Sequence, residues 1–354
     1  MNKIKFDWFL VLPALFLIAL SLTVLRSIAP QIFITQLYFV LVSITAFLIV
    51  SSLDQELIFS LHAPFYFLLL LLTISTSVFG FISRGAQRWI SLGPITIQPS
   101  EILKPFMLIS LAAVSVTQSS RKMLWLVLIG LVPITTVFLQ PDLGTTLVML
   151  VGWASIAAAR FSFKFFISIT LIALLAAVPF YQFFLHDYQK ERIATFINPY
   201  HDPLGSGYHV IQSVIAVGSG QFLGRGLGHG TQTQLRFLPE HHTDFIFASL
   251  SEELGFVGSF FCLVLYAILY WRIYIISQRT TSPKASLFCL SSLALLSFQT
   301  FVNIAMNLGV APITGITLPL LSSGGSSLLS VAIILGLINS ISRNSKSEPI
   351  IVIH

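Results

Sequence analysis

Ten long apolar runs constrain the fold of this 354-residue chain more than any other feature. A helix that crosses a bilayer needs roughly 20 mostly apolar residues. Charged residues make up 9% of the chain, against about 25% in ordinary soluble domains. We therefore predict an all-α polytopic membrane protein. The expected spans are Phe9–Leu25, Leu37–Leu53, Pro64–Ile82, Ile102–Val116, Leu124–Leu139, Thr145–Ala159, Phe165–Leu185, Phe245–Tyr270, Ala285–Val310 and Ser327–Ile341.

The basic residues indicate how these spans are oriented. Most of them fall on one side of the expected bundle: Lys3, Lys5, Arg121, Lys122, Arg160, Lys164, Arg272, Arg279, Lys284, Arg343 and Lys346. By the positive-inside rule both termini are then cytoplasmic, and the polar segment at about 186–243 is an outer loop. The net charge of +6 forms no basic patch, so we expect no nucleic-acid partner. We predict one integral-membrane domain over residues 1–354, with a retained first span rather than a signal peptide.

One polar cluster lies between the third and fourth spans. Residues 84–90 lead through a Gly-Pro pair to Ser100 and Glu101, with Lys104 one turn later. Ser100 predicts a helix N-cap, and the spacing of Glu101 and Lys104 lets the two side chains pair on one helix face. A lysine inside a span needs a carboxylate, a phosphate or water. Trp89 fits either this site or an interfacial aromatic belt.

Two further motifs at the ends of spans contain a charged residue or a series of prolines and small residues. Residues 140–145 contain Asp142, which either caps the sixth span in a tight turn or contributes to a site. Between Asn303 and Ser327, prolines and small residues predict a broken helix or re-entrant loop, which would form a cavity wall. The glycines of residues 218–230 match no phosphate-binding pattern, so we expect close backbone packing there.

Asp244 is the leading candidate for chemistry because it stands where the outer loop meets an apolar run. An ionisable group at that boundary is costly unless it has a function. The alternative is that Thr243 caps the eighth span and Asp244 complements its positive end. Glu252 lies about 12 Å further along that helix at 1.5 Å per residue, so both carboxylates could line one cavity. His241 and His242 are adjacent and lack helical metal-ligand spacing.

These motifs, in this order, resemble the SEDS family (shape, elongation, division and sporulation), which includes RodA, FtsW and SpoVE. The resemblance rests on residues 88–104, residues 140–145, residues 238–247 and residues 303–327. Residues 230–239 are more similar to the elongation type, RodA, than to the division type, FtsW. The similarity spans nearly the whole chain, so it implies ten helices and a place in the bacterial cytoplasmic (inner) membrane.

The resemblance implies a peptidoglycan glycosyltransferase that polymerises lipid II at the outer face during cell elongation. It implies a class B penicillin-binding protein as transpeptidase partner, alongside other membrane proteins of the elongation complex. The family's catalytic aspartate corresponds to Asp244, which we expect to act as general base. We expect substrate to be bound by Arg88, Trp89, Glu101, Lys104, Asp142, Arg192, Arg236, Glu240, Glu252 and Ser323.

Four of these residues, Lys104, Arg88, Arg192 and Arg236, are candidate partners for the departing phosphates. A divalent cation, Mg²⁺ or Mn²⁺, is a further expected supplement to that positive charge. Two other classes fit a chain of this type. One is a lipid II flippase, since charged residues within spans suit alternating access. The other is a scaffold that activates its penicillin-binding partner.

Overall fold

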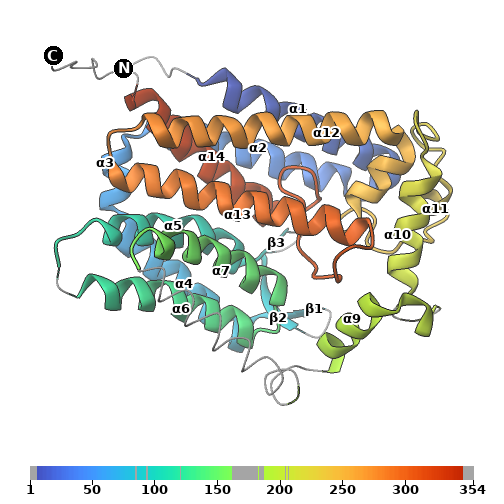
Figure 1. The fold of residues 1–354 in the computed structure, drawn as a ribbon, viewed down its shortest axis with the longest axis horizontal. Helices are drawn as coiled ribbons and strands as arrows, with labels where there is room; N and C mark the ends of the chain where they lie inside the picture. Colours follow the sequence, from blue (N-terminus) through green and yellow to red (C-terminus); the bar gives the residue numbers. More distant parts are fainter. Residues whose placement is uncertain are drawn as a thin grey trace.

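The computed structural model describes residues 6–83, 86–92, 95–119, 121–161, 182, 187–203, 205 and 207–345. It is a bundle of long helices that run roughly side by side (Figure 1). The first helices are α1 (Trp8–Ile28), α2 (Pro30–Ser52), α3 (Gln55–Ser60), α4 (His62–Phe79), α5 (Pro99–Ser115), α6 (Lys122–Leu139) and α7 (Leu143–Ala158). They are followed by α9 (Asp187–Ile197), the 3-10 helix η1 (Pro199–His201), α10 (Tyr208–Ser219), α11 (Thr231–Gln234), α12 (Ile246–Arg279), α13 (Pro283–Asn307) and α14 (Gly325–Ser345).

The predicted polytopic helical architecture is confirmed. Helices cover every predicted span except the seventh, Phe165–Leu185, which lies outside the described residues. Among the described residues, seven helices are long and apolar enough to cross a membrane, and α7 is a shorter apolar helix. The helix α5 has 17 residues and carries Glu101 and Lys104 in its first turns.

The centre of the bundle is formed by α14 and α5, which pack against each other and against several outer helices. The window of α14 that could span a membrane is 83% buried, whereas the corresponding window of α2 is 17% buried. Because α2 is apolar but largely uncovered, its free face is suited to lipid. Gly336 allows α14 to approach α2 closely, since a Cβ there would lie 3.1 Å from the carbonyl oxygen of Phe47.

Both described ends of the chain lie at one end of the bundle. The backbone N–H of Asp7 donates to Asn339 Oδ1, and Ser342 Oγ donates to Asp7 Oδ2. Arg272 on α12 forms a bidentate ion pair with the same carboxylate, at 2.9 and 2.6 Å. The start of α1 and the end of α14 therefore lie close together.

Two segments are more ordered than the sequence indicated. Residues 81–97 contain three short antiparallel strands, β1 (Phe81–Ser83), β2 (Ala86–Leu92) and β3 (Ile95–Ile97), in the order β1-β2-β3. Isoleucine, threonine and tryptophan in this stretch favour extended backbone. The predicted outer loop contains α9, η1, α10 and α11, and α10 runs across the ends of α12 and α13 (Figure 1).

The helix α12 is broken near its start. Gly255 has φ 65° and ψ −161°, a conformation that interrupts the helical hydrogen bonds and that only glycine adopts readily. The break separates a short segment, Ile246–Leu254, from the long remainder of the helix. Asp244 lies two residues before the short segment, so the position of this segment affects where Asp244 lies.

Candidate active site

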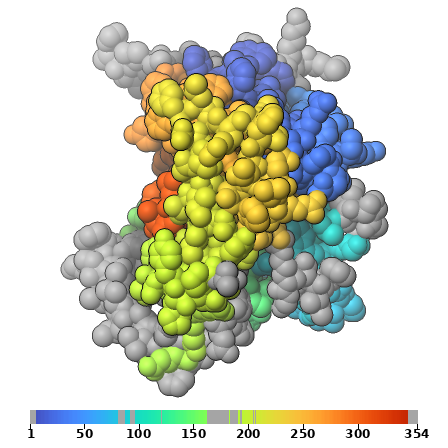
Figure 2. Space-filling model, turned by 90° about the vertical axis from the view of Figure 1, so that its right-hand side faces the viewer, coloured from blue at the N-terminus to red at the C-terminus, as the bar shows by residue number. Residues whose placement is uncertain are grey.

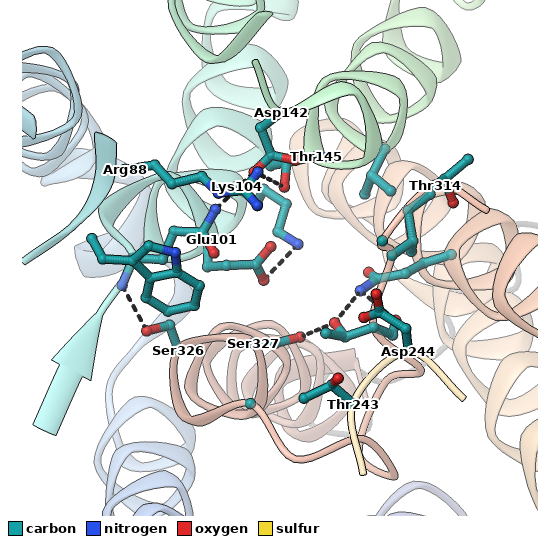
Figure 3. Close-up of a pocket in the computed structure, with 18 of the residues that line it drawn as sticks. Arg88, Glu101, Lys104, Asp142, Thr145, Thr243, Asp244, Thr314, Ser326 and Ser327 are labelled. Atoms are coloured by element: carbon teal, nitrogen blue, oxygen red, sulfur yellow. Dashed lines mark hydrogen bonds and ion pairs between the residues drawn. The ribbon is translucent and has the colours of Figure 1, made fainter. Parts of the chain in front are cut away.

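A cavity of about 580 Å³ opens where the strands, the α6–α7 turn, the start of α12 and the start of α14 meet. It brings together seven of the predicted site residues. These are Arg88, Trp89, Glu101, Lys104, Asp142, Asp244 and Ser323. Figure 3 shows Asp244 across the cavity from Arg88 and Asp142, with the Lys104 side chain extending between the two sides.

Asp142 organises one wall of the cavity. Its carboxylate accepts from the backbone N–H and Oγ1 of Thr145, at 3.1 and 2.9 Å, and thereby caps the start of α7. It also accepts from Gln98 Nε2 at 2.8 Å and pairs with Arg88 Nη1 at 3.0 Å. The expected capping role of Asp142 is confirmed, and the same carboxylate also holds a guanidinium in the cavity wall.

Arg88 keeps an unused donor despite this pairing. Among the described residues, its buried Nε has no hydrogen-bond partner. A buried donor left without a partner costs free energy comparable to a lost hydrogen bond. A guanidinium that is held by one carboxylate and still has an unpaired N–H is suited to bind an anion that enters the cavity.

Glu101 and Lys104 form a second, deeper pair. Their side chains lie one turn apart on α5, and Lys104 Nζ is 2.7 Å from Glu101 Oε2, as their spacing predicted. Lys104 is only 2% exposed. An ammonium group has three N–H donors, and the pair with Glu101 uses one of them. The others are available to an anionic ligand in the cavity.

The backbone of Asp244 is fixed by two asparagines of α13. Asn303 Nδ2 and Asn307 Nδ2 both donate to the Asp244 carbonyl oxygen at 3.0 Å. Asn307 Oδ1 also accepts from the N–H of Ala248, and Asn303 Nδ2 donates to the carbonyl oxygen of Ile316 in the cavity wall. Both asparagines are fully buried, so they connect the start of α12 rigidly to α13 and to that wall.

The segment between α13 and α14 holds the other side of Asp244. Ser322 Oγ donates to the Thr243 carbonyl oxygen at 2.6 Å, and the Ser323 N–H donates to the His242 carbonyl oxygen at 3.0 Å. The prediction of an irregular segment that forms a cavity wall is thus consistent with the structure, because residues 308–324 are non-helical and several of them line the cavity.

Three predicted binding residues with described side chains, Glu252, Arg236 and Glu240, are not among those that line this cavity. Glu252 is fully buried and accepts from the N–H groups of Gln232 and Thr233, at 2.8 and 3.1 Å, so the expectation that it shares a cavity with Asp244 was wrong. Asp244 precedes the first residue of α12, so helical spacing does not relate the two side chains, and the segment around α11 occupies the space beside Glu252. Arg236 is exposed, and the side chain of Arg192 lies outside the described residues.

Glu240, the third of these residues, shapes the turn before Asp244. It has a positive φ of 52°, and its Oε2 accepts from Thr243 Oγ1 at 3.0 Å. The Thr243 hydroxyl is therefore used in this turn, and α12 begins only at Ile246, so the alternative of Thr243 as helix cap was wrong. Ser100 was also wrong as an N-cap, because α5 begins at Pro99 and the cap position is Gln98.

Two functional contributors were not recognised from the sequence. Asn307 was missed, although Asn303 and Asn307 stand four apart and therefore share a helix face. Gln98, whose Nε2 donates to the Asp142 carboxylate, was included only as a member of the motif at residues 88–104. A pair of asparagines at that spacing inside an apolar run is the signal that could have identified the support of Asp244.

The chain resembles one family over nearly its whole length. The sequence profile of the cell cycle protein family of FtsW, RodA and SpoVE matches residues 2–347. Peptidoglycan glycosyltransferase MrdB of Escherichia coli (strain K12) is 42% identical over 291 residues, which cover 80% of this chain and 78% of that protein. Stage V sporulation protein E of Bacillus subtilis (strain 168) is 37% identical over 295 residues, with 79% and 77% covered.

Solved structures agree with this similarity. A chain of a peptidoglycan synthase complex that coordinates polymerization and crosslinking superposes with a TM-score of 0.82 at 32% identity, covering 97% of this chain and 99% of that one. The rod shape determining protein RodA of Thermus thermophilus superposes with a TM-score of 0.73 at 27% identity, covering 98% and 100%.

Proposed function

The chain belongs to the FtsW, RodA and SpoVE family of cell cycle proteins, and from that premise we propose that Asp244 is the general base of its reaction. The protein is a peptidoglycan glycosyltransferase and a multi-pass protein of the bacterial inner membrane. The observation that carries the proposal is one cavity that combines a carboxylate at the start of α12 with Lys104 and Arg88 on the opposite wall.

The proposed substrate is lipid II, used both as donor and as acceptor on the outer face of the membrane during cell elongation. In the reaction, an acceptor hydroxyl attacks the anomeric carbon of the donor sugar. The bond between that carbon and the pyrophosphate oxygen breaks, and the pyrophosphate leaves with the bonding electrons. Asp244 takes the proton of the attacking hydroxyl, which requires hydrogen-bond reach between the two groups.

Lys104 and Arg88 are proposed to bind the pyrophosphate. Negative charge grows on the leaving oxygen as the bond breaks, and fixed donors aimed at that position lower the barrier. The spare N–H groups of Lys104 and the unpartnered Nε of Arg88 can provide such donors without any change in their existing ion pairs. Trp89 and Ser323, which also line the cavity, are proposed to contact the sugar or peptide portions.

A divalent cation, Mg²⁺ or Mn²⁺, remains a proposed supplement that enters with the substrate. The described residues contain no group of three or more His, Cys, Asp and Glu side chains placed to hold a metal ion. Mg²⁺ commonly binds through one or two carboxylates together with substrate phosphates, so a carboxylate of the cavity and the pyrophosphate would hold it.

The decisive experiment compares Asp244→Asn with a matched control. The variant should fold and insert normally but lose roughly 10²- to 10⁴-fold in lipid II polymerisation, the usual contribution of a general base. Asp202→Asn is the control, because it makes the same chemical change at an exposed carboxylate outside the cavity. Glycan synthesis at the wild-type rate by Asp244→Asn would remove this carboxylate from the mechanism.

The same purified protein separates the two other classes. A flippase moves labelled lipid II across liposomes without forming polymer, whereas the proposed enzyme forms polymer. A scaffold loses polymer formation when the partner's own active site is inactivated. One relative in a solved complex is part of an assembly that couples polymerization to crosslinking, which supports a class B penicillin-binding protein as the proposed partner here.

A further inference from the structure

The glycine-rich segment 220–229 occupies the break in α12. The N–H groups of Arg225 and Gly226 donate to the carbonyl oxygens of Glu252 and Glu253, at 2.9 and 3.0 Å. In return, the N–H groups of Phe256 and Val257 donate to the carbonyl oxygens of Gln221 and Phe222, at 2.8 and 3.2 Å. The segment therefore replaces helical hydrogen bonds that the break at Gly255 removes.

Two buried carboxylates satisfy other N–H groups of this region. Glu253 Oε1 accepts from the N–H of Gly228 at 2.9 Å, and also from Ser27 Oγ on α1. The Glu252 carboxylate accepts hydrogen bonds from the N–H groups of Gln232 and Thr233 at the start of α11. Seven of the ten N–H groups of residues 220–229 have a partner among the described residues, which suits a segment at the edge of the hydrocarbon, where hydrogen-bond partners are scarce.

The segment also places large apolar side chains on the surface. Phe222 is 65% exposed and Leu223 is 78% exposed. The Phe222 ring stacks on Phe256 at 5.8 Å, and Phe256 stacks on Phe260 at 5.9 Å, so the three rings form a continuous ladder. Phe256 and Phe260 belong to the exposed apolar face of a helix that is long enough to cross the membrane. The apolar surface of the segment is thus continuous with the lipid-facing surface of α12.

The depth of the ladder fits the acyl region of one leaflet. Phe256 lies about 24 Å along α12 from Arg272 at 1.5 Å per residue, and Arg272 pairs with Asp7 at the end of the bundle that holds both chain ends. The hydrocarbon core is about 30 Å thick, so Phe256 and the stacked Phe222 fall near its opposite edge. Figure 2 views this end of the molecule, which the yellow-green and yellow segment from α9 to α11 covers.

We infer that residues 220–229 form a re-entrant membrane anchor that inserts Phe222 and Leu223 among the lipid acyl chains of the outer leaflet. The polar side chains of the segment mark the boundary between this anchor and the headgroups. Arg225 and His229 are exposed, and Arg225 Nε donates to the Ser219 carbonyl oxygen. They occupy the headgroup level, in the way that basic side chains reach from an apolar surface toward water. This surface lies outside the cavity and does not depend on the role of Asp244.

The experiment measures the depth of single spin-labelled cysteines in the full chain. The native Cys262 and Cys289, both fully buried, are replaced by alanine, and the protein is placed in nanodiscs of phosphatidylethanolamine and phosphatidylglycerol. Phe222→Cys and Leu223→Cys are compared with Phe260→Cys on the lipid face of α12 and with His229→Cys in the same segment. Leu223→Cys provides a second measurement if the Phe222 variant fails to fold, since the Leu223 side chain is the more exposed of the two.

Labels at 222 and 223 should collide several-fold more often with oxygen than with a water-soluble nickel chelate, as the label at 260 does. The label at 229 should show the reverse preference. A preference for the nickel chelate at 222 and 223 would overturn the inference. Loss of oxygen collisions at both positions in the presence of the co-purified transpeptidase partner would also overturn the inference, because the surface would then be a protein contact.

Discussion

The buried pair of Glu101 and Lys104 shows how single residues of the cavity combine structural and chemical demands. Lys104 is nearly inaccessible, and an isolated charge at that depth would be strongly destabilising. Glu101 neutralises it from the same helix face, one turn away. The ion pair therefore offsets the cost of the buried charge, and Lys104 keeps N–H donors for a phosphate.

A charge-neutral double variant separates these two demands. Lys104→Met alone should lower the free energy of unfolding by about 3–5 kcal/mol, because it leaves a carboxylate buried without a partner. Glu101→Gln combined with Lys104→Met should recover most of that loss, as measured by thermal unfolding in detergent. Both variants should be inactive in lipid II polymerisation. Activity in the double variant would show that the ammonium group does not contact the substrate.

Asn303 and Asn307 hold the backbone of Asp244, although we do not expect them to touch the substrate. Asn307→Ala removes one donor to the Asp244 carbonyl oxygen and the acceptor for the Ala248 N–H. The expected result is a fall in kcat of about 10-fold or more with little change in KM, since the base loses alignment while the binding groups remain.

The control for this variant is Asn339→Ala. Asn339 is also a fully buried asparagine, and its Oδ1 accepts a backbone N–H, but it lies on α14 at the opposite end of the bundle. Both substitutions should lower thermal stability, whereas only Asn307→Ala should change kcat per folded molecule. Equal kcat values for the two variants would mean that Asn307 serves stability alone.

At the scale of elements, the broken helix α12 is the feature that places the cavity wall containing Asp244. An unbroken helix over Ile246–Arg279 would leave no place for the inserted segment 220–229. A Cβ at Gly255 would lie 2.2 Å from the backbone nitrogen of Gly224, and the residue also needs its positive φ. Sequence periodicity correctly predicted an apolar helix here but gave no sign of the break, because a glycine within a helical pattern is also compatible with a regular helix.

Two glycine substitutions test this interpretation. Gly255→Ala should destabilise the protein by more than about 1 kcal/mol and reduce polymerisation, because the inserted segment must move and Asp244 moves with it. Gly218→Ala is the matched control on α10, where a Cβ would meet nothing within 4 Å. It should be neutral or slightly stabilising, since alanine favours a helix over glycine by about 1 kcal/mol. Thermal unfolding and polymerisation rates of both variants check the pair.

At the scale of the whole molecule, the two ends of the chain close the bundle. Asp7 joins the start of α1 to Arg272 on α12 and to Asn339 and Ser342 on α14. These contacts connect residues more than 260 positions apart in the sequence. They lie at the end of the bundle opposite the cavity, so their contribution is to the stability of the fold rather than to the reaction.

Arg272→Met should therefore destabilise the protein without changing the chemistry. It leaves the buried Asp7 carboxylate without its bidentate partner, which should cost about 3–5 kcal/mol. Arg279→Met, at an exposed position on the same helix, should have little effect. A lowered midpoint of thermal unfolding with unchanged kcat per folded molecule is the expected result, and a fall in kcat for Arg272→Met would contradict it.

The sequence by itself determined the membrane class, the positions of the described spans and seven of the residues that line the cavity. These follow from local rules: apolar runs must be long enough to cross a bilayer, and charged residues must have a reason to lie near them. The pair of Glu101 and Lys104 was also predictable, because helical spacing alone brings the side chains together.

Only the tertiary structure decided which motif residues share a cavity and which ones support the fold. Asp244 and Glu252 lie eight positions apart, yet one lines the cavity and the other is buried against a loop. The difference arises from partners that are distant in the sequence, namely the asparagines of α13 for Asp244 and the segment around α11 for Glu252. Helical periodicity gives the direction of a side chain, but the space it enters is set by elements that fold against it.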